Sequence, residues 1–245
     1  MDQFRRAAVH SMYWKNIPDE IRLGQKAVFD YLKIPLIQEC ADKVSHGDWM
    51  NEVIARHSSD EVVVFCDIDA FPLNASAYEN AVTSALQGRI FGLAQYSNHH
   101  QNLEIYAGPM FMAFQKSTWE KLGCPQLKSN EMHDAGEVMS LLARQQGVKL
   151  ELTMPSSCLI PKWSLAHYGV FGIGTFYGGC DFFHLFESRL PAYGLLFKSV
   201  VEDTVGGKKL NFNNYLEITR GHRTDVWDAV GKLMHRIKSR LARMV

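Results

Sequence analysis

Short apolar runs alternate with amphipathic segments through the first 150 residues of the chain. The strongest run, Val62 to Cys66, has five consecutive apolar residues, which is typical of a strand buried on both faces. Further strands are predicted at 7–14, 34–37, 90–94, 105–114 and 148–152, and helices at 18–33, 48–56, 76–86 and 132–146. This alternation predicts an α/β fold with a mostly parallel central sheet flanked by helices.

The pattern changes after Pro155. Residues 163–179 are rich in glycine and aromatic side chains without a clear period, so we expect an irregular, mobile or acceptor-facing segment there. Thr224 to Val245 combines an apolar stripe with many basic residues, which predicts a C-terminal amphipathic helix. We therefore divide the chain into a catalytic domain, 1–215, and a basic helical tail, 216–245. The stripe of the tail favours packing on the domain or on a partner, with peripheral membrane contact as the alternative.

Composition narrows the class of protein. The chain has 245 residues, of which 47% are hydrophobic and 21% are charged, as in an ordinary globular domain. Its formal net charge is zero, which gives no reason to expect nucleic acid as a partner. The five cysteines are scattered and lack metal-ligand spacing, which predicts reduced thiols. The sequence shows no apolar signal segment and no run of 18 apolar residues. Together these features predict a cytoplasmic protein.

Two aspartates, Asp67 and Asp69, follow the buried run at the position where the strand would end. Ligands of open α/β sheets bind outside the carboxyl ends of strands. Two carboxylates this close repel each other unless a cation or a proton separates them, and Mg²⁺ prefers one or two carboxylates together with substrate phosphates. The pair therefore predicts a metal site shared with a phosphorylated substrate. The alternative is a solvated turn that caps the helix near Asn74.

The stretch VVVFCDIDAFPLN resembles the D-x-D segment of GT-A glycosyltransferases, which transfer a sugar from a nucleotide-sugar donor. Segments 46–54, 106–123, 133–150 and 182–189 resemble later parts of that superfamily and follow in the order its fold requires. The resemblance covers residues 7 to 190 and implies a GT-A-like, Rossmann-like fold. The chain departs from the superfamily at Met12 to Asn16, where the contacts to the nucleotide base would lie.

The resemblance implies a site for Mn²⁺ or Mg²⁺ formed by Asp67, Asp69 and His184, with a nucleotide-sugar donor as partner. Asp69 and His184 would hold the ion, and Asp67 would lie nearer the ribose or bridge to the ion through water. The alternative for His184 is a packed core residue. Arg189 follows His184 closely and is expected to clamp the donor phosphates. Gly108 permits close approach of the backbone, so we expect it to line a bound sugar; a tight strand entry is the alternative.

A sugar transferase that inverts configuration also needs a carboxylate to take the proton of the acceptor hydroxyl. Asp134, at the start of a predicted helix, is the first candidate, and Glu137, one turn on, is the second. The alternative is that Asp134 caps the helix and Glu137 completes a capping box. Trp163 and Tyr168 are candidates for stacking on a sugar ring.

The predicted function is thus metal-dependent transfer of a sugar from a nucleotide-diphosphate sugar to a hydroxyl acceptor, either a glycan or a lipid-linked saccharide. One alternative is a haloacid-dehalogenase-like phosphatase that uses Asp67 and Asp69. Phe71 stands where that class has Thr or Val, and no later G-D-x-x-x-D segment is present. The other alternative is a nucleotide-sugar-binding protein of the same fold without turnover.

Overall fold

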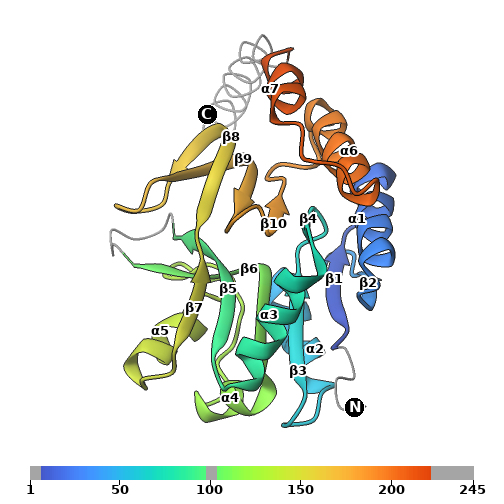
Figure 1. Cartoon of the computed structure of the whole chain (residues 1–245). Helices are drawn as coiled ribbons and strands as arrows, with labels where there is room; N and C mark the ends of the chain where they lie inside the picture. Colours follow the sequence, from blue (N-terminus) through green and yellow to red (C-terminus); the bar gives the residue numbers. More distant parts are fainter. Residues whose placement is uncertain (1–6, 98–103, 222–245) are drawn as a thin grey trace, which may run out of the picture.

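The computed structural model describes residues 7–97 and 104–221, which form two sheets with helices around them (Figure 1). The larger sheet has six strands in the order β2-β1-β3-β6-β5-β7. Their bounds are β1 Val9–Tyr13, β2 Leu36–Cys40, β3 Val62–Cys66, β5 Ile90–Tyr96, β6 Ile105–Gln115 and β7 Leu150–Thr153. Strand β1 runs parallel to β2 and β3, and β5 parallel to β7, whereas β6 is antiparallel to β3 and β5. The predicted α/β fold with a mostly parallel central sheet is confirmed.

Helices cover both faces of this sheet. The described helices of the chain are α1 Asp19–Leu32, α2 His46–Ala55, α3 Ala75–Leu86, α4 Lys116–Lys121, α5 Glu137–Gln145, α6 Pro191–Val205 and α7 Phe212–Gly221. Alternate residues of β3 enter different cores: Val62 and Val64 pack with α1 and α3, and Val63 and Phe65 pack with α2 and α5. The uninterrupted apolar run of β3 therefore reflects burial on both faces, as its sequence predicts.

The smaller sheet is antiparallel, with the order β4-β10-β9-β8. Its strands are β4 Ala70–Pro72, β8 Pro155–Ser164, β9 Val170–Tyr177 and β10 Phe182–His184. The expectation of an irregular segment at 163–179 is wrong, because most of it belongs to the β8–β9 hairpin. A Cβ atom at Gly172 would lie 2.2 Å from the Ile160 carbonyl oxygen, so this glycine permits close strand approach.

The start of one helix also differs from the sequence prediction. Helix α5 begins at Glu137, later than the predicted start at 132, because Gly136 has a φ of 79°, outside the helical region. At the C-terminal end, α7 spans Phe212–Gly221, and Gly221 is the last described residue. The predicted amphipathic helix from Thr224 onward lies outside the described residues. None of the described helices is long and apolar enough to cross a membrane.

Strand β1 carries a buried histidine that gives the fold a pH dependence. The His10 side chain is 6% exposed, its ring lies edge-on to that of His57 with centroids 5.1 Å apart, and its Nδ1 has no hydrogen-bond partner within the described chain. Burial, with a further contribution from His57, lowers the pKa of His10 from 6.5 to about 4. The unfolded chain therefore binds more protons than the folded chain between these two pH values.

We predict that this difference lowers the free energy of unfolding by about 1–2 kcal/mol between pH 7 and pH 5. The His10→Phe variant keeps a ring that does not titrate, so its free energy of unfolding should fall less over the same range. Urea unfolding at several pH values measures both slopes. Parallel pH profiles for the two proteins would show that His10 does not titrate as proposed.

Candidate metal centre

Asp67 and Asp69 lie on the turn that joins β3 of the large sheet to β4 of the small one. The turn closes with a hydrogen bond from the Ala70 N–H to the Asp67 carbonyl at 3.0 Å. The Asp67 N–H donates to the Met110 carbonyl in β6, and the Leu185 N–H, just after β10, donates to the Asp69 carbonyl. The turn is therefore tied to both sheets, and its two carboxylates lie where the sheets meet.

The structure brings the three predicted metal ligands together. One ligand atom from each of Asp67, Asp69 and His184 lies within 4.8 Å of the other two. The His184 Nε2 atom is 3.2 Å from Asp69 Oδ1 and 3.9 Å from Asp67 Oδ2. This proximity follows from the strand register, in which His184 of β10 pairs with Ala70 of β4. Two carboxylates and one imidazole form a donor set that fits a divalent cation.

The two carboxylates differ in their electrostatic environment. Burial, opposed by His46 and reinforced by Asp69, raises the pKa of Asp67 above its usual value. Burial acts on Asp69 as well, but His184 and the Ser188 hydroxyl, which donates to Asp69 Oδ2 at 2.5 Å, hold its pKa below the usual value. The two shifts have opposite directions, so Asp67 is protonated more readily than Asp69. A bound cation would relieve the repulsion between them.

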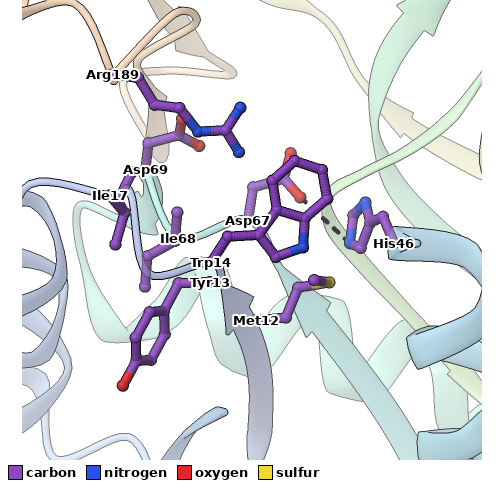
Figure 2. Close-up of a pocket in the computed structure, with 9 residues that line it drawn as sticks. All are labelled: Met12, Tyr13, Trp14, Ile17, His46, Asp67, Ile68, Asp69 and Arg189. Atoms are coloured by element: carbon purple, nitrogen blue, oxygen red, sulfur yellow. Dashed lines mark ion pairs between the residues drawn. The ribbon is translucent and has the colours of Figure 1, made fainter. Parts of the chain in front are cut away.

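His46, which the sequence analysis did not select, is a further residue at this centre. It is the first residue of α2, and its Nε2 lies 3.5 Å from Asp67 Oδ1 (Figure 2). The neighbouring Gly47 allows this placement, since a Cβ there would lie 2.3 Å from the Lys128 Cα. One sequence signal could have located His46 at a helix start, namely the N-cap residue Ser45. Its hydroxyl accepts a hydrogen bond from the Asp48 N–H, and the helix begins at His46.

A first cavity of about 210 Å³ opens on one side of the carboxylates (Figure 2). Its lining residues are Met12, Tyr13, Trp14, Ile17, His46, Asp67, Ile68, Asp69 and Arg189. The Arg189 guanidinium carbon lies 4.8 Å from the centroid of the Trp14 ring, and the Trp14 indole N–H donates to the Val44 carbonyl. A fixed aromatic ring and a cation therefore stand beside the acidic pair.

A second cavity, of about 460 Å³, shares His46, Asp67 and Asp69 with the first. Its other lining residues are Gln95, Tyr106, Pro109, Met110, Ser129, Asp134, Ala135, His184, Phe186 and Glu187. The Tyr106 hydroxyl donates to Asp134 Oδ2 at 3.2 Å. Burial and the nearby Asp134 raise the pKa of Tyr106 well above its usual value, so Tyr106 stays a donor at neutral pH. A half-buried carboxylate, that of Asp134, therefore lines the same cavity as the candidate metal ligands.

Glu137, the second candidate base, lies behind the cavity wall. Its side chain is 1% exposed, and its Oε2 accepts from the Asp134 N–H at 2.8 Å. This bond is one half of the capping box considered for these two residues. The N-cap position of α5 is nevertheless occupied by Gly136 and not by Asp134. Glu137 therefore fixes the backbone of Asp134, whose side chain faces the cavity.

Gly108, Trp163 and Tyr168 are not among the described residues that line the two cavities. Gly108 is buried within β6, where a Cβ would lie 2.7 Å from Gln95 Oε1, and the adjacent Pro109 lines the second cavity. Trp163 packs on Phe171 and Phe186 with centroid separations of 5.5 and 5.1 Å. Tyr168, at the end of the β8–β9 hairpin, is 54% exposed.

Comparisons with known proteins provide little beyond this geometry. No family model and no curated protein matches the sequence. Among solved structures, the chain is similar to 4-diphosphocytidyl-2C-methyl-D-erythritol synthase from Anaerococcus prevotii, with 12% sequence identity and a TM-score of 0.33. The similarity covers 60% of this chain and 89% of that one. A likeness this distant gives no guide to activity.

The raised pKa of Asp67 leads to a prediction for the metal-free protein. A folded-state pKa above the unfolded value favours the protonated folded form, so ionising Asp67 destabilises the fold as pH rises through that pKa. Asp67→Asn mimics the neutral acid, and we expect it to raise the melting temperature in EDTA at pH 8 by about 2–4 °C. Asp30→Asn, on the exposed surface of α1, is the charge-matched control. An Asp67→Asn protein that melts below the wild type would contradict the prediction.

Proposed function

We propose that the protein is a metal-dependent glycosyltransferase that moves a sugar from a nucleotide-diphosphate sugar to a hydroxyl acceptor. One observation carries the proposal: the cluster of Asp67, Asp69 and His184 lies between two cavities with complementary chemistry. The first offers an aromatic ring and a cation, and the second offers a half-buried carboxylate. Donor and acceptor would then meet at the cluster.

The first cavity suits the nucleotide diphosphate. Trp14 offers a flat face for stacking, and Arg189 offers a guanidinium that can pair with phosphate oxygens. Asp67, Asp69 and His184 would hold the divalent cation, and the imidazole in this set favours Mn²⁺ over Mg²⁺. When bound, such a cation supplies the positive charge that stabilises the departing diphosphate.

The second cavity suits the sugar and its acceptor. Asp134 would accept the proton of the acceptor hydroxyl as that oxygen attacks the sugar. The Tyr106 hydroxyl orients the Asp134 carboxylate from the side, and Glu137 holds its backbone from behind. These contacts fix the base before substrate arrives, which is a condition for efficient proton transfer. The acceptor in this proposal is a glycan or a lipid-linked saccharide.

The first test is ligand-dependent stability. A panel of nucleoside diphosphates is added with Mn²⁺ or with EDTA, and the melting temperature is measured. We expect at least one nucleotide at about 100 times its Kd to raise the melting temperature by about 5–10 °C, and only when Mn²⁺ is present. Asp69→Asn should lose the shift, because it removes one carboxylate ligand from the cluster, and Asp30→Asn should retain it.

The outcomes separate the three predicted functions. The absence of any nucleotide shift would overturn the glycosyltransferase proposal. Phosphate release from a generic phosphomonoester, abolished by Asp67→Asn, would favour the phosphatase. A nucleotide shift without release of nucleoside diphosphate from any sugar donor would favour the binding protein.

Asp134 gives a second prediction, on turnover. Asp134→Asn keeps an oxygen that can accept from Tyr106 but cannot take a proton. With the donor identified by thermal shift, we expect nucleoside diphosphate release to fall by about 10²–10⁴-fold, with nucleotide affinity changed less than about twofold. Glu151→Gln is the matched control, because Glu151 pairs with Arg89 and is not among the described residues that line either cavity. Equal losses in both variants would remove Asp134 from the role of base.

A further inference from the structure

Helix α1 carries a fully buried glutamine on its apolar face. Ile21, Val28 and Phe29 on this face are 0% exposed, and so is Gln25 between them. Burying an amide without hydrogen-bond partners costs about 2–7 kcal/mol, whereas a leucine could occupy such a position without this penalty. Gln25 therefore needs partners inside the core, and those partners lie at the metal centre.

The Gln25 amide bonds to both ends of the turn that carries the metal ligands. Its Nε2 donates to the Asp67 carbonyl at 2.7 Å and to the Ala70 carbonyl at 2.9 Å. Its Oε1 accepts from Gln38 Nε2 at 2.9 Å, and Gln38 also donates to the Arg22 carbonyl. Since Gln38 faces the oxygen, the amide is oriented with its NH₂ group toward the turn.

We propose that Gln25 is a positioning residue for the metal centre, which holds the Asp67–Ala70 turn so that both carboxylates face His184. The proposal rests on the proposed function, because it assumes that the cluster binds a cation. Asp67 and Asp69 repel each other, and the turn between them would relax if it were not attached to the helix. Gln25 is not among the described residues that line the two cavities, so it acts through the turn.

The effect of removing Gln25 should fall on the site more than on the fold. Each of the two carbonyls keeps another donor, which is the Ala70 N–H for Asp67 and the Cys66 thiol, at 3.2 Å, for Ala70. The variant thus loses the connection between turn and helix without leaving either oxygen unpaired. Residues that orient metal ligands from behind typically change metal affinity by about 10–100-fold when they are mutated.

The test uses the full chain, stripped of metal and titrated with Mn²⁺ alone. Free Mn²⁺ is followed by electron paramagnetic resonance well below the melting temperature of each protein. Gln25→Met keeps the length of the side chain but cannot donate, and we expect its Kd for Mn²⁺ to rise at least about tenfold. Val28→Ala is the matched control, because it weakens the same helix face and its aliphatic side chain forms no hydrogen bond to the turn, and its Kd should stay within about twofold of the wild type.

A second variant covers failure of Gln25→Met to fold. Gln25→Glu has the same shape but cannot donate to both carbonyls, so the same weakening is expected. An unchanged Kd in either folded Gln25 variant would overturn the positioning role. Equal weakening in Val28→Ala would also overturn it, because general loss of stability would then explain the change. A wild-type protein that binds no Mn²⁺ would instead overturn the metal site and the proposed function.

Discussion

The antiparallel pairing of β4 with β10 is the contact on which the candidate site depends. Both short strands belong to the small sheet, with Phe71 opposite Phe183 and Ala70 opposite His184, and the turn that carries Asp67 and Asp69 connects β4 to β3 of the large sheet. The Phe71 ring packs on Phe183 and on Phe197 of α6, so the pairing is buried within the main core. Without this register His184 would not reach Asp69, and the Leu185 N–H would not bind the Asp69 carbonyl.

The turn between β3 and β4 holds two acidic side chains close together, an arrangement that does not stabilise the fold. Asp67 has a raised pKa, and Asp69 stays ionised through its bonds to His184 and Ser188. A protein selected for stability alone would place apolar or neutral groups here, since buried like charges oppose folding. Tertiary contacts instead hold the acids in place from several sides: β6 and the segment after β10 through the backbone, α1 through Gln25, and α2 through His46. These contacts are consistent with the proposed cation, which would relieve the repulsion between the two carboxylates.

The two cavities divide the surroundings of the cluster by chemistry. One wall comes from the end of β1 and the segment after β10, which supply Trp14 and Arg189. The opposite wall comes from β6 and the residues that precede α5, which supply Tyr106 and Asp134. Asp134 is held by a side-chain bond and a backbone bond, so its position is set before any ligand binds. In the proposed function, the two cavities would give the donor and the acceptor separate binding places.

The sequence alone determined the α/β class, the buried strand Val62–Cys66 and the location of Asp67 and Asp69 at its end, because burial on both faces requires a continuous apolar run. The order of the segments that resemble GT-A glycosyltransferases also pointed to His184 and Asp134, and both residues line the second cavity. The β8–β9 hairpin is not predicted from the glycine and aromatic residues in 163–179, since their role in close strand packing depends on a partner strand.

Tertiary structure alone decided the parts that depend on distant contacts. His46 reaches Asp67 because Gly47 lets α2 approach the backbone of Lys128, and Gln25 reaches the turn because α1 crosses behind it. Neither contact leaves a periodic signal, because hydrophobic periodicity reports only which face of an element is buried. Which polar side chain meets which acid is fixed by packing between elements, and for this site that packing determines the chemistry.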